Sequence, residues 1–380
     1  MESIFLKSHR ILISGAGIAG LALARRLQQL GIEHVVIEKN EQSNLSSSGI
    51  ALPFNAIQAL RKMGLAETIL ESAHQVNEII YTKKNGRTIS RASLLEAPLN
   101  QDKFVAMRRS KLHEILLNGI ESHINFGTTI QSAHSDDEGV NVTCSNTALS
   151  GQYDAVVSAE GIHSTLRNQC FPDENTLLDH NISNWRFVID YPNHGLQPTY
   201  MLANTELFLA YPIDPNTLYC YAHVYDDSEQ FKNGSPQAHL RNLFGDFKGN
   251  VNNILDRLGD QPVICSRLRS VRKPYYAKDR IVFIGDAGSA CSPLLQQGAA
   301  SAFEDALCFA EQCHKHDMDK AIFEYQRIRS PRVEWVVKTS DDPIKKLKMM
   351  ANPIGATIRN MIIRRKGPLN VQGWKHLAVK

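Results

Sequence analysis

Residues 10–27 read Arg10-Ile-Leu-Ile-Ser-Gly15-Ala-Gly17-Ile-Ala-Gly20-Leu-Ala-Leu-Ala-Arg-Arg-Leu27, which predicts an apolar strand, a glycine-rich turn and a helix. The glycines follow the G-x-G-x-x-G spacing. Gly15 permits the tight turn, Gly17 lets a pyrophosphate approach the backbone, and Gly20 lets the helix pack closely on the strand. The unpaired N–H groups at the start of such a helix can then bind phosphates.

A second strand follows and ends in a carboxylate. The run His34-Val-Val-Ile-Glu38 is rich in β-branched residues, which favour strands. Glu38 stands where an acidic residue accepts hydrogen bonds from a ribose. Strand, helix, strand and acid in this order predict a Rossmann-like domain that binds a dinucleotide, and the motif suits FAD and NAD equally well.

The composition is that of an ordinary globular chain. With 380 residues, 43% of them hydrophobic and 21% charged, it is expected to form two or three lobes and not a disordered or fibrous structure. A net charge of only +3 argues against a dedicated nucleic-acid binder. The seven cysteines form no C-x-x-C pair, which favours reduced thiols in a cytoplasmic protein. No apolar run approaches the roughly 18 residues that a transmembrane segment needs.

A stretch near residue 285 decides between the cofactors. The apolar residues 281–284 run directly into Gly285-Asp286, and Pro293, Gln297-Gly298 and Glu304-Asp305-Ala306 follow in that order. Here the chain resembles the single-component FAD-dependent aromatic hydroxylases, the salicylate and para-hydroxybenzoate hydroxylase type that also contains the tetracycline-inactivating monooxygenases. That family has G-D-A-A-H-x-x-x-P and then G-Q-G-x-x-x-x-x-E-D-A. This chain departs from the pattern at Ser289 and Gln296.

Three more segments resemble the same family. Residues 153–167 match its D-x-V-V-x-A-D-G-x-x-S-x-x-R segment, with Glu160 in place of the aspartate. Arg109-Ser-Lys-Leu112 matches an Arg-x-x-Leu helix start, and residues 48–56 resemble the loop that runs close to the mobile flavin ring. The resemblance covers residues 10 to about 330 in order.

The resemblance implies FAD as the cofactor and NAD(P)H as a transient co-substrate. It implies that Asp286 bonds the ribityl chain, that Arg109 reaches the ribityl or phosphate region, and that the backbone at Gly298 and Ala299 faces the pyrimidine edge of the flavin. With the first motif, the predicted cofactor contacts are Gly15, Gly17, Ala19, Gly20, Glu38, Lys39, Gly49, Arg109, Gly161, Asp286, Pro293, Gly298 and Ala299.

Between these motifs lie β-rich segments with polar and glycine breaks, at residues 184–191, 207–212 and 217–225. In the last of them, period two places four side chains on one face: Tyr219, Tyr221, His223 and Tyr225. Such a face could form a wall over the flavin ring, or it could pack on a helix or meet solvent. The candidate substrate contacts are Arg186, Tyr211, Tyr221 and His223.

We therefore expect an α/β protein of the para-hydroxybenzoate hydroxylase type. The Rossmann-like FAD-binding domain is expected at 1–75, 101–172 and 277–330, a β-sheet substrate domain at 76–100 and 173–276, and C-terminal helices at 331–380. After Pro331 the pattern predicts a helix to about Ser340 and a second one after Pro343. Residues 331–380 contain eleven Lys and Arg but only three Asp and Glu. A solvated tail or interdomain brace is favoured over membrane contact, because glycines and a proline interrupt it at Gly355, Gly367, Pro368 and Gly373.

The activity implied by the resemblance is that of a monooxygenase. NAD(P)H reduces FAD, O2 forms a flavin C4a-hydroperoxide, and one oxygen atom passes to an aromatic or polyketide-like small molecule, with tetracycline inactivation as one example. The flavin carries the chemistry, so no catalytic side chain and no metal site are predicted. One alternative is a reductase or oxidase of the same fold, such as the geranylgeranyl-reductase type. The other is a non-catalytic flavin-binding protein, which is suggested by the departures from the family pattern at Glu160, Ser289 and Gln296. The choice of NADH or NADPH and the oligomeric state stay open.

Overall fold

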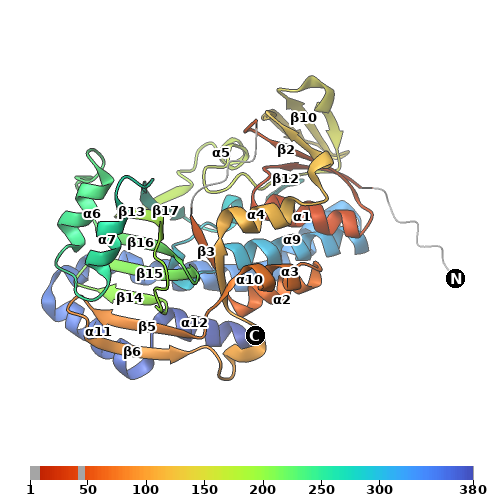
Figure 1. The fold of residues 1–380 in the computed structure, drawn as a ribbon. Coiled ribbons are helices and arrows are strands. Elements are labelled where there is room, and N and C mark those ends of the chain that lie inside the picture. The colour runs from red at the N-terminus through yellow and green to blue at the C-terminus, as the bar shows by residue number, and fades with distance from the viewer. Residues whose placement is uncertain (1–8, 42–47, 380) are drawn as a thin grey trace.

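Two large sheets organise the molecule (Figure 1). The computed structural model describes residues 9–41 and 48–379. The first sheet has the order β18-β19-β12-β1-β2-β8, and every neighbouring pair in it is parallel except β18 with β19. Its strands are β1 (Arg10–Ser14), β2 (Glu33–Glu38), β8 (Ile124–Phe126), β12 (Ala155–Ser158), β18 (Ala277–Lys278) and β19 (Ile281–Phe283).

Both faces of this sheet are buried, as expected for parallel strands. Ile11 and Ile13 of β1 pack with the helices on one face, while Leu12 packs with a small antiparallel sheet on the other. The helices are α1 (Ile18–Gln29), α2 (Phe54–Lys62), α3 (Ala66–Ser72), α4 (Arg109–Leu117) and α9 (Gly298–Lys315), and the small sheet holds β9 (Ile130–Ser135), β10 (Val140–Cys144) and β11 (Gly151–Tyr153).

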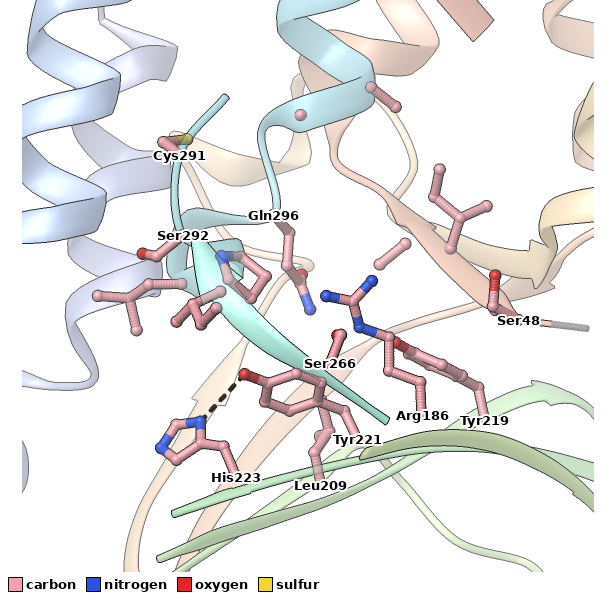
Figure 2. A pocket seen from close by; sticks show the side chains of 18 of the residues that line it. Ser48, Arg186, Leu209, Tyr219, Tyr221, His223, Ser266, Cys291, Ser292 and Gln296 are labelled. Atoms are coloured by element: carbon pink, nitrogen blue, oxygen red, sulfur yellow. Dashed lines mark hydrogen bonds between the residues drawn. The ribbon is translucent and has the colours of Figure 1, made fainter. Parts of the chain in front are cut away.

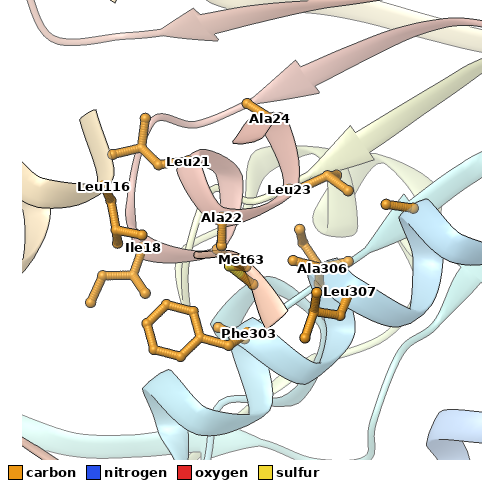
Figure 3. Close-up of a cluster of buried hydrophobic side chains, with 14 of the residues drawn as sticks. Ile18, Leu21, Ala22, Leu23, Ala24, Met63, Leu116, Phe303, Ala306 and Leu307 are labelled. Atoms are coloured by element: carbon orange, nitrogen blue, oxygen red, sulfur yellow. The ribbon is translucent and has the colours of Figure 1, made fainter. Parts of the chain in front are cut away.

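The packing of α1 on α9 joins the two motif regions, which are far apart in the sequence. Figure 3 shows small and branched side chains of α1, among them Ile18 and Ala22, against Phe303, Ala306 and Leu307 of α9. All of these side chains are buried. The glycine turn before α1 and the segment before α9 therefore lie next to each other.

The second sheet has the order β17-β13-β16-β15-β14-β5-β6. One of its faces is covered by α6 (Pro236–Phe244) and α7 (Val251–Leu258), which bury an apolar cluster with β13, β15 and β16. The other face is turned toward the segment between β19 and α9. The strands are β5 (Glu78–Lys83), β6 (Thr88–Ser93), β13 (Leu177–Asp190), β14 (Thr199–Leu202), β15 (Leu207–Asp214), β16 (Thr217–Tyr225) and β17 (Ile264–Val271).

Short elements connect the two sheets. The strands β3 (Gly49–Leu52), β7 (Val105–Arg108) and β4 (His74–Gln75) form a three-stranded sheet between them. The helices α5 (Thr165–Cys170) and α8 (Asp286–Ser289) are the next elements along the chain after β12 and β19. The predicted α/β fold, with a Rossmann-like sheet, a second β-rich lobe and C-terminal helices, is confirmed. The predicted domain boundaries stay a prediction, and residues 1–8 and 42–47 of the first predicted segment lie outside the described residues.

The C-terminal helices differ from the prediction. A single helix, α10 (Met318–Lys345), runs through both Pro331 and Pro343, so the predicted break after Ser340 is wrong. Each proline removes one backbone donor, but α10 buries one side along its length, including Val333, Val336 and Ile344. This packing outweighs the two lost hydrogen bonds.

Two of the four predicted breaks in the tail also lie inside helices. Gly355 belongs to α11 (Pro353–Lys366), and Gly373 belongs to α12 (Leu369–Ala378), where a Cβ would come within 2.6 Å of the Leu295 side chain. Gly367 and Pro368 do separate the two helices. In the described part of the chain, no helix combines the length and the apolar character that crossing a membrane requires.

Candidate functional site

A cavity of about 550 Å³ lies between the second sheet and the segment that connects β19 to α9 (Figure 2). Its lining combines residues from both groups of predicted contacts. The predicted cofactor residues in it are Gly49, Arg109, Asp286, Pro293, Gly298 and Ala299, and the predicted substrate residues are Arg186, Tyr211, Tyr221 and His223. Segments that are far apart in the sequence thus meet in one space.

The turn after β19 directs Asp286 into the cavity. Gly285 adopts φ +56°, and a Cβ there would lie 2.9 Å from the Cβ of Ala19, so a glycine is needed at this close approach. The Gly285 N–H donates to Asp305 Oδ2 at 3.0 Å. Asp286 follows with its side chain exposed to the cavity. Burial raises the pKa of its carboxyl, and the positive charges of Arg109 and Arg186 oppose that rise.

A buried ionic network holds this turn. Arg329 of α10 donates from Nε to Asp305 Oδ1 at 2.7 Å and from Nη1 to Glu304 Oε2 at 2.8 Å. Arg332 also bonds Glu304, at 2.7 Å. Burial opposes ionisation of Glu304, but the two arginines lower its pKa below the usual value. The Glu-Asp pair of the second motif therefore acts by positioning the turn that carries Asp286.

The start of α1 forms a second, separate part of the site. Glu38 Oε2 accepts the Ala16 N–H at 2.9 Å, which holds the carboxylate at the helix start. No side chain caps the helix at Gly17, and a Cβ at Gly17 would meet no atom within 4 Å. The first N–H groups of α1 and the space above them are thus free of capping side chains. The predicted residues gathered around this end of the sheet are Gly15, Gly17, Ala19, Gly20, Glu38, Lys39 and Gly161.

Glu160, where the family pattern has Asp, bonds the protein itself. Its carboxylate accepts hydrogen bonds from Ser14 Oγ at 2.7 Å, Ser164 Oγ at 2.9 Å and the Leu166 N–H at 3.0 Å. It therefore ties β1 to the first turn of α5. Arg167 of the same segment is buried and donates to the Ala287 carbonyl at 2.7 Å, which connects this motif to the turn after β19.

The face of β16 that the alternation singles out forms one wall of the cavity. Tyr219, Tyr221 and His223 line it, while Cys220 and Ala222 pack on the opposite side with α6 and α7. Tyr225 is not among the lining residues; it lies near Lys348. A Cβ at Gly49 would lie 2.5 Å from Tyr219, so this glycine lets β3 approach the tyrosine wall.

Arg186 extends from β13 into the cavity. Figure 2 shows its guanidinium pointing toward Gln296, with Tyr219 and Tyr221 on its two sides. It forms no hydrogen bond or ion pair with any residue that the structure describes. Its positive charge opposes the rise that burial causes in the pKa of Asp286, the acidic side chain of the same lining. A half-buried cation without an ion-pair partner is suited to receive an anionic ligand.

Tyr221 and His223 form a polar pair at the far end of the wall. The Tyr221 hydroxyl and His223 Nδ1 lie 3.1 Å apart, within hydrogen-bond distance (Figure 2). Burial, together with the positive charge of Arg359, lowers the pKa of His223 to about 4. Burial raises the pKa of the Tyr221 hydroxyl. At neutral pH the pair is therefore an imidazole and a phenol, both uncharged.

Sequence reasoning did not identify several lining residues. Gln296 adopts φ +52° and donates from Nε2 to the Tyr200 hydroxyl at 2.8 Å. Tyr200 in turn stacks on Tyr81 of β5, with ring centroids 4.5 Å apart. The one sequence feature that pointed to Gln296 was its departure from the family pattern. No sequence feature pointed to its partner Tyr200, whose position depends on how the strands pair. The other lining residues missed include Leu207, Leu209, Ile213, Ser266, Cys291 and Ile344.

The lowered pKa of His223 predicts a specific pH dependence of stability. The unfolded imidazole, with a pKa near 6.5, binds a proton more readily than the folded one, so stability falls as the pH drops below about 6.5. At pH 5 this cost is about 2 kcal/mol. In His223→Gln, the loss of unfolding free energy between pH 7 and pH 5 should be smaller by about that amount. Urea unfolding at both pH values measures it, and equal losses in the two proteins would contradict the assignment.

The two parts of the site fit the two ends of FAD. The uncapped start of α1 with Glu38 offers donors for the pyrophosphate and an acceptor for the adenosine ribose. The cavity end offers Asp286 for the ribityl chain and the start of α9, where no side chain caps the helix at Gln297, for the pyrimidine edge of the ring. The residues present thus match a long dinucleotide with a charged middle and a flat, polar-edged ring.

Comparison with known proteins supports this assignment. A family model described as an FAD binding domain matches residues 8–340. The chain is 29% identical over 365 residues to the 2-heptyl-3-hydroxy-4(1H)-quinolone synthase of Pseudomonas aeruginosa, covering 93% of each protein. It is 28% identical over 316 residues to a flavin-dependent monooxygenase of Legionella longbeachae, covering 80% of each. Among solved structures, Klebsiella pneumoniae HpxO complexed with FAD and uric acid matches with a TM-score of 0.87 at 21% identity, covering 100% of this chain and 99% of that one.

Proposed function

Because this chain belongs to the FAD binding domain family, with flavin-dependent monooxygenases among its relatives, we propose that it hydroxylates a flat, anionic aromatic compound of one or two rings. The reductant is NAD(P)H, the oxidant is O2, and the reaction takes place in the cytoplasm. The observation that carries the proposal is Arg186, an unpaired cation within an aromatic-walled cavity. When bound, FAD supplies the electron transfer and the oxygen activation.

The charge of the substrate follows from the charges that line the cavity. Figure 2 shows Arg186 pointing into the cavity, and Arg109, which also lines it, is assigned to the FAD. Asp286, the acidic side chain in the same lining, is assigned to the ribityl chain. Arg186 is therefore left to bind a carboxylate, a phenolate or another acidic group on the substrate, and this contact orients the ring.

The size of the substrate follows from the shape of the cavity. The end at Asp286, Gly298 and Ala299 receives the flavin ring, so only part of the 550 Å³ remains for a second molecule. Tyr211, Tyr219 and Tyr221 line the cavity with aromatic rings, and Leu209 and Ile213 add apolar surface. This space suits one or two fused rings better than the four rings of a tetracycline. The names of two relatives, which mention a 4(1H)-quinolone and uric acid, concern flat rings of this size.

Tyr221 and His223 are placed to hold the substrate by hydrogen bonds. The Tyr221 hydroxyl lines the cavity and lies 3.1 Å from His223 Nδ1, and burial keeps both groups uncharged at neutral pH. A neutral phenol and a neutral imidazole can exchange hydrogen bonds with a hydroxyl group or ring nitrogen of the substrate. We assign this pair to orienting the substrate, while the tyrosine wall and Leu209 exclude water.

The proposal is tested by substituting Arg186. We expect Arg186→Gln to raise KM for an anionic aromatic substrate by about 100-fold, the loss of a charge-assisted contact worth about 3 kcal/mol, with FAD content unchanged. Arg186→Lys should recover part of that loss, since it keeps the charge but not the bidentate geometry. The measurement is steady-state NAD(P)H oxidation with matched anionic and neutral aromatic compounds. If the anionic compound loses no more than the neutral one, Arg186 does not bind the anion.

A further inference from the structure

The outer face of α11 carries an exposed apolar stripe. Ile354, Ile358, Met361 and Ile362 follow the i, i+4, i+7, i+8 pattern of one helix face, and their exposed fractions are 68%, 48%, 53% and 49%. We call these four residues the α11 stripe. Among the other large apolar residues of the described chain that are exposed, Met349 lies in the 3-10 turn just before α11, and the others, such as Leu95 and Phe323, lie on separate elements. A contiguous stripe of this kind marks an interaction surface.

The inner face of α11 fixes this orientation. Arg359 donates from Nη1 to the Asn204 carbonyl at 2.8 Å and from Nη2 to the Ala203 carbonyl at 2.5 Å. Ala356 is buried, and Ile363 packs against the apolar cluster beneath the second sheet. Figure 1 shows α11 beside the edge strand β6 at the outside of the molecule. The stripe therefore cannot turn inward without breaking these contacts.

Basic side chains flank the stripe on both sides. Residues 344–366 contain seven Lys and Arg and no Asp or Glu. Lys345 and Lys348 pair with Asp342 and Asp227 at the surface. Four exposed cations of this stretch form no ion pair with any residue the structure describes: Lys346, Arg364, Arg365 and Lys366. The surface thus combines apolar side chains with unpaired positive charge.

We propose that α11 docks the protein on an anionic membrane surface, with the α11 stripe in the acyl-chain boundary and the flanking cations at the lipid headgroups. This combination of an apolar face and Lys or Arg neighbours is the one that lies flat in a lipid interface. A second copy of the chain is a poorer partner, because a symmetric contact of this face would bring its cations together without any acid. The stretch also adjoins the site: Ile344, just before Lys345, lines the cavity, and Arg359 lies near His223.

The test is co-sedimentation of the FAD-loaded protein with vesicles of phosphatidylcholine, with and without phosphatidylglycerol. The stripe variant is Ile358→Gln with Met361→Gln, and the charge variant changes Arg364, Arg365 and Lys366 to Gln. The matched control is Leu95→Gln with Phe323→Gln, whose side chains are 55% and 59% exposed on other elements. Because all these side chains are at the surface, FAD content, apparent Tm and activity on a water-soluble substrate should stay at wild-type values.

We expect the wild type and the control to bind the anionic vesicles at least tenfold more tightly than the neutral ones, and high salt to weaken this binding. The stripe variant and the charge variant should each lose at least tenfold. Equal binding by the stripe variant and the wild type, or no vesicle binding at low salt, would overturn the proposal. If the stripe variant instead converts an oligomer to a monomer in size-exclusion chromatography while vesicle binding is absent, the face is an interface between copies and the proposal fails.

Discussion

Gly20→Ala is expected to destroy the FAD-binding lobe. A Cβ at Gly20 would lie 1.9 Å from the Gly15 carbonyl oxygen, which is a backbone atom at the centre of the turn. Neither group can move without separating α1 from β1, so we expect a loss of about 3 kcal/mol or more. The variant should be recovered largely insoluble or without flavin. Apparent Tm and the ratio of flavin to protein absorbance measure both effects.

Gly17→Ala is the matched control for this prediction, because it makes the same chemical change three residues earlier. A Cβ at Gly17 would have no atom within 4 Å, so the apoprotein should keep its stability to within about 1 kcal/mol. Its FAD affinity should nevertheless fall at least tenfold, since the methyl group occupies the space through which the pyrophosphate reaches the helix start. If Gly17→Ala binds FAD normally, the phosphate does not lie there. If Gly20→Ala folds and binds FAD normally, the close contact is wrong.

Arg329→Met is expected to have the second large effect. Arg329 is 5% exposed and neutralises both Glu304 and Asp305. Its removal leaves two buried carboxylates with one remaining partner, Arg332, and such uncompensated charge costs about 3–5 kcal/mol. The turn that Asp305 holds through Gly285 should also loosen, which releases flavin. Thermal unfolding and flavin retention at neutral pH measure the two consequences.

Arg327→Met provides the control on the same helix. Arg327 is exposed, and its partner Glu324 is half-buried and also pairs with Lys320, so the loss of this one ion pair costs little. This variant should unfold and retain flavin as the wild type does. Equal stability of Arg329→Met and Arg327→Met would show that the buried network does not hold the lobe together.

Much of the fold was predictable because its signals are local. Gly15, Gly17 and Gly20 fix a strand-turn-helix unit within a dozen residues, and the alternation along residues 217–225 fixes which tyrosines share a face. The error at α10 has the opposite origin. A proline is a strong local signal, but the tertiary packing of Val333, Val336 and Ile344 overrides it.

The candidate site was predictable only where a motif carried it. The cavity side chains that no motif contains depend on strand order and on contacts between distant elements. Tyr200 stacks on Tyr81 because β14 lies beside β5 in the second sheet, a pairing across more than one hundred residues, and the Tyr200 hydroxyl then accepts a hydrogen bond from Gln296. The ionic network is similar, because Arg329 lies one helix beyond the Glu304-Asp305 pair. The unpaired state of Arg186, on which the proposed substrate class rests, could be recognised only once its neighbours were known.

The most direct test of this account is the fate of oxygen during turnover with an anionic aromatic compound. The purified, flavin-loaded protein is supplied with NAD(P)H and isotopically labelled O2, and the product is analysed by mass spectrometry. The account predicts slow NAD(P)H oxidation without the aromatic compound, a rise of at least several-fold with it, and a product that contains one labelled oxygen atom. If no compound accelerates NAD(P)H oxidation and no product carries the label, the protein is not a hydroxylase, and a reductase or oxidase of the same fold becomes the better description.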